Sequence, residues 1–99
     1  MQPGELKQCS DLWKEVWDKP IAELFKYPVD WKALELPDYP RIIKKPMDLQ
    51  TVKNKLNEGL YSNAFEFSED LRLIWRNAKC YNRTNSNIHK NAESLDKNG

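Results

Sequence analysis

The sequence predicts an all-α domain, a four-helix bundle with a long loop after the first helix and a short loop before the fourth. Apolar residues recur every three or four positions in four separate stretches, which is the spacing of one buried helix face. Only three glycines occur in 99 residues, and four of the six prolines fall between positions 28 and 46. The apolar spacing predicts the helices, and the proline cluster predicts the long loop.

The first helix is expected at about residues 5–24. One face of it carries a periodic apolar stripe: Leu6, Cys9, Trp13, Val16, Trp17 and Ile21. Pro20 lies inside this range, and a proline removes one backbone hydrogen bond and crowds the preceding turn. We therefore expect a kink or a break at Pro20.

Residues 27–47 are expected to form the long loop. A connection of about twenty residues is uncommon in a compact domain and usually has a function. This loop also carries many apolar side chains: Val29, Trp31, Leu34, Leu36, Tyr39, Ile42, Ile43 and Met47. So much apolar surface predicts that the loop folds back on the bundle.

The second helix is expected at about residues 49–58. Asp48 precedes it and can cap it, because a carboxylate accepts hydrogen bonds from the free amides of the first turn. Gly59 follows it, and glycine adopts the left-handed conformation that often ends a helix.

The third helix, at about residues 63–81, has the most regular apolar spacing of the chain. The polar stretch 82–87 has turn-forming residues, and a fourth amphipathic helix begins at about residue 88. Short connections between these helices favour a bundle within a single module that spans residues 1–99.

The composition argues against several functions. Sixteen basic and 15 acidic residues give a net charge of +1, so no overall field attracts nucleic acid or an anionic membrane. No apolar run approaches the roughly 20 residues that span a bilayer. Cys9 and Cys80 lack partners at metal-ligand spacing, and His89 stands alone. We expect no catalytic residues, no metal and no cofactor.

Asn82 ends the third predicted helix, and two interpretations of it remain open. Its side chain or a left-handed backbone can cap the helix. Alternatively, its amide projects as a fixed donor and acceptor into a mouth between the two loops, which can lie at the same end of the bundle.

Residues 34–82, "LELPDYPRIIKKPMDLQTVKNKLNEGLYSNAFEFSEDLRLIWRNAKCYN", resemble the bromodomain family. The shared motifs are Pro-Asp-Tyr, Pro-Met-Asp-Leu, Tyr-Ser-Asn and the closing Tyr-Asn, in the family's order and spacing, and "FKYPVD" at residues 25–30 also matches. The resemblance covers roughly residues 12–95. It implies a left-handed four-helix bundle whose long first loop and short last loop frame a pocket for acetyl-lysine.

The resemblance also implies roles for eight residues. Asn82 corresponds to the asparagine that donates to the acetyl carbonyl oxygen, and Tyr39 holds the same oxygen through a water molecule. The remaining positions line the pocket with apolar side chains. Val29, Leu34 and Leu36 form one wall, and Phe25 forms the floor. Tyr81 packs at the side of the pocket, and Ile88 is the gatekeeper residue that narrows its rim.

Physical chemistry supports such a site independently. Acetylation replaces a hydrated ammonium by a neutral amide. An apolar slot therefore rejects the unmodified lysine, because burying an unpaired cation costs several kcal/mol. A single hydrogen bond nets only about 0.5–1.5 kcal/mol, so one acetyl-lysine should bind in the micromolar-to-millimolar range.

One stretch departs from the family pattern. Many bromodomains carry Trp-Pro-Phe, which forms a flat shelf beside the pocket, where this chain reads Glu23-Leu24-Phe25. These three residues are called here the altered shelf. We expect a more open and more acidic rim. Two hypotheses follow: Glu23 attracts neighbouring lysines of a partner's basic tail, or Tyr27 and Trp31 replace part of the missing wall.

The resemblance implies a non-catalytic reader of acetylated histone tails or other acetyl-lysine proteins. By the same resemblance it is a monomeric module of a larger chromatin protein in the nucleus. The alternative is a protein-interaction scaffold of the same fold that has lost acetyl-lysine binding, which the altered shelf favours and the intact Asn82 and Tyr39 oppose.

Overall fold

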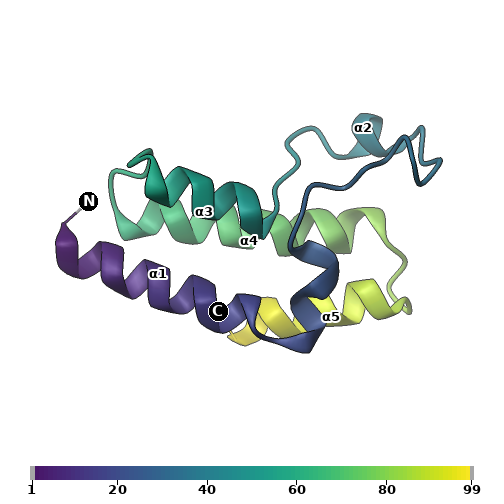
Figure 1. The fold of residues 1–99 in the computed structure, drawn as a ribbon. Helices are drawn as coiled ribbons and strands as arrows, with labels where there is room; N and C mark the ends of the chain where they lie inside the picture. The colour runs from purple at the N-terminus through teal and green to yellow at the C-terminus, as the bar shows by residue number, and fades with distance from the viewer. Residues whose placement is uncertain (1, 99) are drawn as a thin grey trace.

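The computed structural model describes residues 2–98, and all regular secondary structure among them is helical. The elements in chain order are α1 (Pro3–Trp17), the three-ten helix η1 (Pro20–Phe25), α2 (Tyr39–Ile42), α3 (Leu49–Asn57), α4 (Ala64–Tyr81) and α5 (Asn87–Asn98). Figure 1 shows α1, α3, α4 and α5 lying alongside one another as a four-helix bundle. The long loop with α2 and the short loop before α5 lie at the same end, away from the N-terminus (Figure 1).

The first helix is shorter than expected. The predicted range 5–24 is wrong at its end, because α1 stops at Trp17 and η1 begins at Pro20. Lys19 adopts an extended conformation (φ −73°, ψ 133°), as a residue that precedes proline is biased to do. The break expected at Pro20 is therefore present, and the chain continues as a three-ten helix instead of a kinked α-helix. Leu6 of the predicted stripe is 40% exposed, because it lies beside Gly59 at the end of the bundle.

The other three long helices lie within one residue of their predicted bounds. Side-chain caps fix two of their starts. The Asp48 carboxylate accepts from the Thr51 amide (2.9 Å), and the Asn63 side chain accepts from the Glu66 amide (3.0 Å). Gly59 follows α3 with a positive φ of 69°, which a glycine adopts at little cost.

The core surrounds α4, which contacts α1, α3 and α5. Its buried apolar side chains are Cys9, Val16, Ala22, Phe25, Leu49, Val52, Leu56, Tyr61, Phe67, Leu71, Ile74, Trp75, Ala78, Ala92 and Leu95. Trp75 is buried, whereas Trp13 and Trp17 pack against the core while half-buried. The Trp13 indole donates to the Leu49 carbonyl at 2.7 Å. This bond ties α1 to the start of α3.

The long loop is anchored at its base and contains structure of its own. The backbone N–H of Gln50 donates to the Lys26 carbonyl (2.9 Å), and this bond joins the two ends of the loop. Within it, the short helix α2 packs against α4. The loop therefore folds back on the bundle, as its apolar content predicted.

Within residues 2–98, no helix combines the length and the apolar character needed to cross a membrane. Over the same residues, no group of three or more His, Cys, Asp or Glu side chains is arranged to hold a metal ion.

Candidate binding site

A cavity of about 160 Å³ lies between the long loop, the C-terminal half of α4 and the start of α5. It is lined by Leu24, Phe25, Tyr27, Val29, Leu34, Leu36, Tyr39, Met47, Ile74, Asn77, Ala78, Tyr81, Asn82 and Ile88. All eight residues that the resemblance implied are among them. The structure therefore brings together side chains that are up to 63 positions apart in the sequence, from Phe25 to Ile88.

The cavity has a buried floor and an exposed mouth. Phe25 is 7% exposed and packs edge-on against the Trp75 ring, with ring centres 5.3 Å apart. Ile74 is 2% exposed, whereas Leu24 and Leu34 are 58% and 60% exposed. The floor is fixed by the core, and the mouth is formed by residues of η1 and the long loop.

Asn82 caps the helix, which is one of the two interpretations that its sequence position allowed, and it also lines the cavity. Its Nδ2 donates to the Ala78 carbonyl oxygen (2.9 Å), so the side chain caps the end of α4. Its backbone is extended (φ −94°, ψ 149°) and not left-handed. Because a side-chain amide has two N–H groups, this bond orients the amide and leaves the second N–H and Oδ1 for a ligand at the cavity wall.

Two tyrosines and an aspartate join the long loop to α4 beside Asn82. The rings of Tyr39 and Tyr81 meet edge to face with centres 4.9 Å apart. The Tyr81 hydroxyl donates to Asp38 Oδ1 at 2.7 Å. This bond raises the pKa of Tyr81, with smaller contributions from desolvation and nearby charge. Burial, followed by the negative charge of Asp48, raises the pKa of Tyr39. Both hydroxyls therefore stay protonated at neutral pH and can act as hydrogen-bond donors.

Asn77 is a second link that sequence reasoning missed. Its Nδ2 donates to the Lys45 carbonyl (2.8 Å), on the part of the loop that leads into α3. Asn77 and Tyr81 are four residues apart, so they lie on one face of α4. The helix that Asn82 caps is thus joined to the long loop at two points.

Leu24, Met47, Ile74 and Ala78 also line the cavity without having been assigned to the site. Helical spacing could have found two of them, since Ile74 and Ala78 stand eight and four residues before Asn82.

The altered shelf differs in part from expectation. Glu23 pairs with Lys26 (2.9 Å), and Lys26 also lies over the Trp17 ring, 4.8 Å from its centre, so a neighbouring cation already balances this acidic group. Tyr27 does form part of the wall, with its ring edge-on to Trp17, whereas Trp31 is not among the lining residues.

Fold and site together define a small helical recognition module with an apolar slot and one oriented amide. The bromodomain family model matches residues 9–94. The chain belongs to the bromodomain family.

The chain is also similar to longer curated proteins. It is 48% identical to transcription factor GTE11 of Arabidopsis thaliana over 92 residues, which cover 93% of this chain and 15% of that protein. It is 47% identical to protein cbp-1 of Caenorhabditis elegans over 89 residues, 90% of this chain and 4% of the relative. For transcription factor GTE5, chloroplastic, of Arabidopsis thaliana, the identity is 43% over 90% of this chain and 18% of the relative. The chain thus spans less than a fifth of the length of each.

Membership of this family supports a general role as an acetyl-lysine reader. Proteins of this family are typically non-catalytic.

Proposed function

We propose that this domain binds acetylated lysine side chains, on histone tails or other acetylated proteins, without catalysing a reaction. One observation carries the proposal. An apolar cavity of about 160 Å³ has the oriented amide of Asn82 on its wall, at the end where the two loops meet.

In this proposal the lysine stem and methyl group fill the apolar slot, with the methyl group over Phe25. Asn82 donates its second N–H to the acetyl carbonyl oxygen, and Tyr39 holds the same oxygen through a water molecule. Val29, Leu34, Leu36, Tyr81 and Ile88 enclose the stem. An unmodified lysine is excluded, because the cavity offers its ammonium no carboxylate among the lining residues.

We also propose that the domain works as a monomeric module of a larger nuclear chromatin protein. Relatives named transcription factors support nuclear action, and all of the quoted relatives are much longer than this chain. Imaging of the tagged full-length protein tests the location, because the names of some relatives carry the word chloroplastic.

The test is a calorimetric titration with acetylated and unmodified histone-tail peptides, run on wild type and Asn82→Ala. Asn82 also caps α4, so its replacement lowers stability as well as removing the donor. Asn63→Ala is the matched control, because Asn63 caps the other end of the same helix and lies outside the cavity. Loss of the Asn63 cap should cost about 0.5–2 kcal/mol, and loss of the Asn82 hydrogen bond about 0.5–1.5 kcal/mol.

Binding that needs the acetyl group, disappears in Asn82→Ala and persists in Asn63→Ala supports the proposal. If the folded wild type ignores every acetylated peptide, the domain is instead an interaction scaffold of the bromodomain fold. Equal loss of binding in both variants would show that stability, and not the amide, controls the site.

A further inference from the structure

The mouth of the cavity carries large apolar side chains that are exposed. Among the described residues, eight large apolar side chains are exposed, and four of them line this cavity. These four, called here the apolar rim, are Leu24, Tyr27, Val29 and Leu34. Apolar side chains gathered around one opening mark a contact surface, whereas scattered ones need no explanation.

Contacts within the chain hold two parts of the apolar rim, the Tyr27 ring and the turn that carries Leu34. The Tyr27 ring packs edge-on against Trp17, with ring centres 5.8 Å apart. Backbone hydrogen bonds from Leu34 to Asp30 (3.0 Å) and from Leu36 to Trp31 (2.8 Å) fix the turn that carries Leu34. A surface that is already ordered loses little entropy when a partner covers it.

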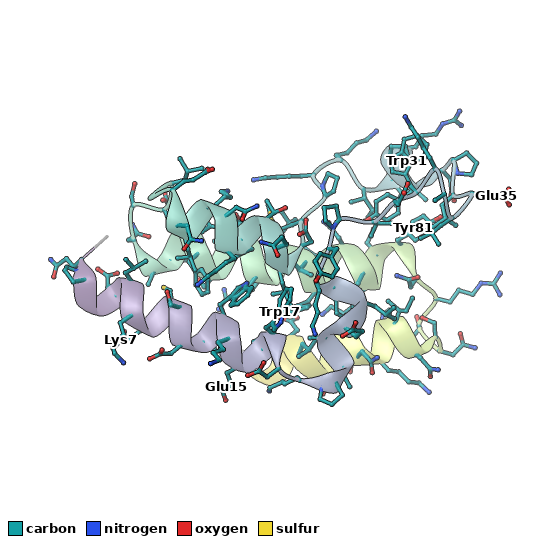
Figure 2. The ribbon with its side chains drawn as sticks, in the orientation of Figure 1. Lys7, Glu15, Trp17, Trp31, Glu35 and Tyr81 are labelled. Atoms are coloured by element: carbon teal, nitrogen blue, oxygen red, sulfur yellow. The ribbon has the colours of Figure 1, made fainter. Side chains whose placement is uncertain are left out.

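The charges nearest the mouth are mixed. Residues 23–38 contain four carboxylates and two lysines. Glu23 is paired with Lys26, whereas Asp30 and Asp38 accept from the Ala33 amide and the Tyr81 hydroxyl, which are neutral donors and supply no balancing charge. The fourth, Glu35, points away from the bundle at the outer tip of the long loop (Figure 2).

Counted over the whole of both loops, the side chains carry no net negative charge. Residues 23–45 carry five basic and four acidic side chains, and residues 82–88 carry Arg83 and no acidic residue. A tail with several unmodified lysines therefore gains no net attraction from either loop.

We infer that the preferred partner of this domain carries a large apolar side chain within three residues of its acetyl-lysine, seated on the apolar rim, and lacks adjacent cations. This inference rests on the proposed function and specifies the sequence context that the same site selects. The rim is continuous with the slot, so one extended peptide segment can fill the slot and cover the rim.

The experiment uses acetyl-lysine peptides that are otherwise identical and carry Leu, Ser or Lys at each position from −3 to +3. Affinities are measured for wild type, Leu24→Ser, Leu34→Ser and Phe65→Ser. Phe65 is the matched control, since it is 66% exposed but lies outside the cavity. Wild type should bind the Leu peptide about tenfold more tightly than the Ser peptide at one position or more, as expected for partial burial of one leucine side chain. Lys should bind no better than Ser.

The preference should shrink in the rim variants and not in the control. In a double-mutant cycle, Leu24→Ser or Leu34→Ser should reduce the Leu-to-Ser ratio to less than about threefold, while Phe65→Ser keeps the wild-type ratio. Equal affinity for Leu and Ser peptides at all positions, or a ratio that survives both rim substitutions, would overturn the inference while leaving acetyl-lysine recognition intact. Absence of any acetyl-dependent, Asn82-dependent binding would overturn the proposed function itself, and this inference with it.

Discussion

Two tyrosine–aspartate hydrogen bonds lie at opposite ends of the bundle and differ mainly in burial. Tyr61, just before α4, donates to Asp70 Oδ2 at 2.6 Å, and both side chains are buried. Tyr81, the last residue of α4, donates to Asp38 Oδ1 at 2.7 Å, and this bond is exposed. The same chemical contact therefore stands once inside the core and once on the surface beside the cavity.

The buried bond belongs to a larger polar cluster. Lys55 pairs with the same Asp70 oxygen at 2.7 Å and lies over the Tyr61 ring, 4.8 Å from its centre. These contacts join α3, α4 and the turn between them. Since water is largely excluded, each partner depends on the others, and losing one leaves a buried polar group unsatisfied.

The exposed bond joins a loop to a helix instead. Water can replace either partner of the Tyr81–Asp38 pair, so the bond adds little to the folding free energy. It fixes where the long loop lies relative to the end of α4. The comparison predicts that the buried bond stabilises the fold, whereas the exposed one positions the candidate site.

The largest expected effect comes from Asp70→Ala. Removing this carboxylate leaves the Lys55 ammonium and the Tyr61 hydroxyl without their common acceptor. We expect the free energy of unfolding to fall by about 3 kcal/mol, and Tm to fall by about 10–20 °C for a domain of this size. Thermal and urea unfolding measure both quantities.

Asp11→Ala is the control for this change. Asp11 pairs with Lys7 at 3.2 Å, but both side chains are more than two-thirds exposed, at 69% and 79%. Such a surface pair is worth less than about 1 kcal/mol. A loss of stability in Asp70→Ala no greater than in Asp11→Ala would mean that the buried cluster does not stabilise the fold.

A smaller effect should appear at alkaline pH. Burial raises the pKa of Tyr61 well above the ordinary value of 10.0, and the hydrogen bond and the charge of Asp70 raise it further. Above about pH 10 the unfolded tyrosine releases its proton while the folded one keeps it, so the unfolded state binds fewer protons and stability falls as pH rises. Tyr61 alone should contribute a loss of about 1.4 kcal/mol per pH unit there.

Tyr61→Phe separates this effect from other alkaline changes. Its free energy of unfolding should be lower than that of wild type at pH 7, and it should decline less steeply between pH 10 and 11. Urea unfolding at each pH measures the two slopes. Parallel slopes for the two proteins would contradict the assigned role of Tyr61.

Features set by local sequence could be predicted, and contacts across the chain could not. Asp48 and Asn82 were placed correctly at helix ends, because a cap depends on residues three or four positions away. The same holds for α4, whose apolar spacing is regular along its whole length. The end of α1 was harder to place, since Pro20 prohibits a helical hydrogen bond without fixing how many residues unwind before it.

The eight site residues came from spaced motifs, whereas the bonds that hold the site span long sequence separations. Asn77 and Lys45 are 32 positions apart, and Tyr81 and Asp38 are 43 positions apart. No periodicity links such pairs, because their meeting depends on how the long loop packs. The ion pair of Glu23 with Lys26 was missed for a different reason. The two residues are only three positions apart, but the place of the Lys26 ammonium also depends on its contact with the Trp17 ring.

The smallest effect on stability should come from Tyr81→Phe, and it sharpens the comparison most. The substitution keeps the ring contact with Tyr39 and removes only the hydroxyl that Asp38 accepts from. Tm should change much less than in Tyr61→Phe. Affinity for an acetyl-lysine peptide should fall, on the order of threefold, because a looser loop must be ordered when the ligand binds. Hydrogen exchange of the backbone amides in residues 36–43 should become faster in the free domain while the amides of α3 keep their protection.

Asp38→Asn keeps an oxygen acceptor for the Tyr81 hydroxyl and should restore most of the affinity that Asp38→Ala loses. If Tyr81→Phe instead lowered Tm as much as Tyr61→Phe and left affinity unchanged, the exposed bond would stabilise the fold and would not position the site.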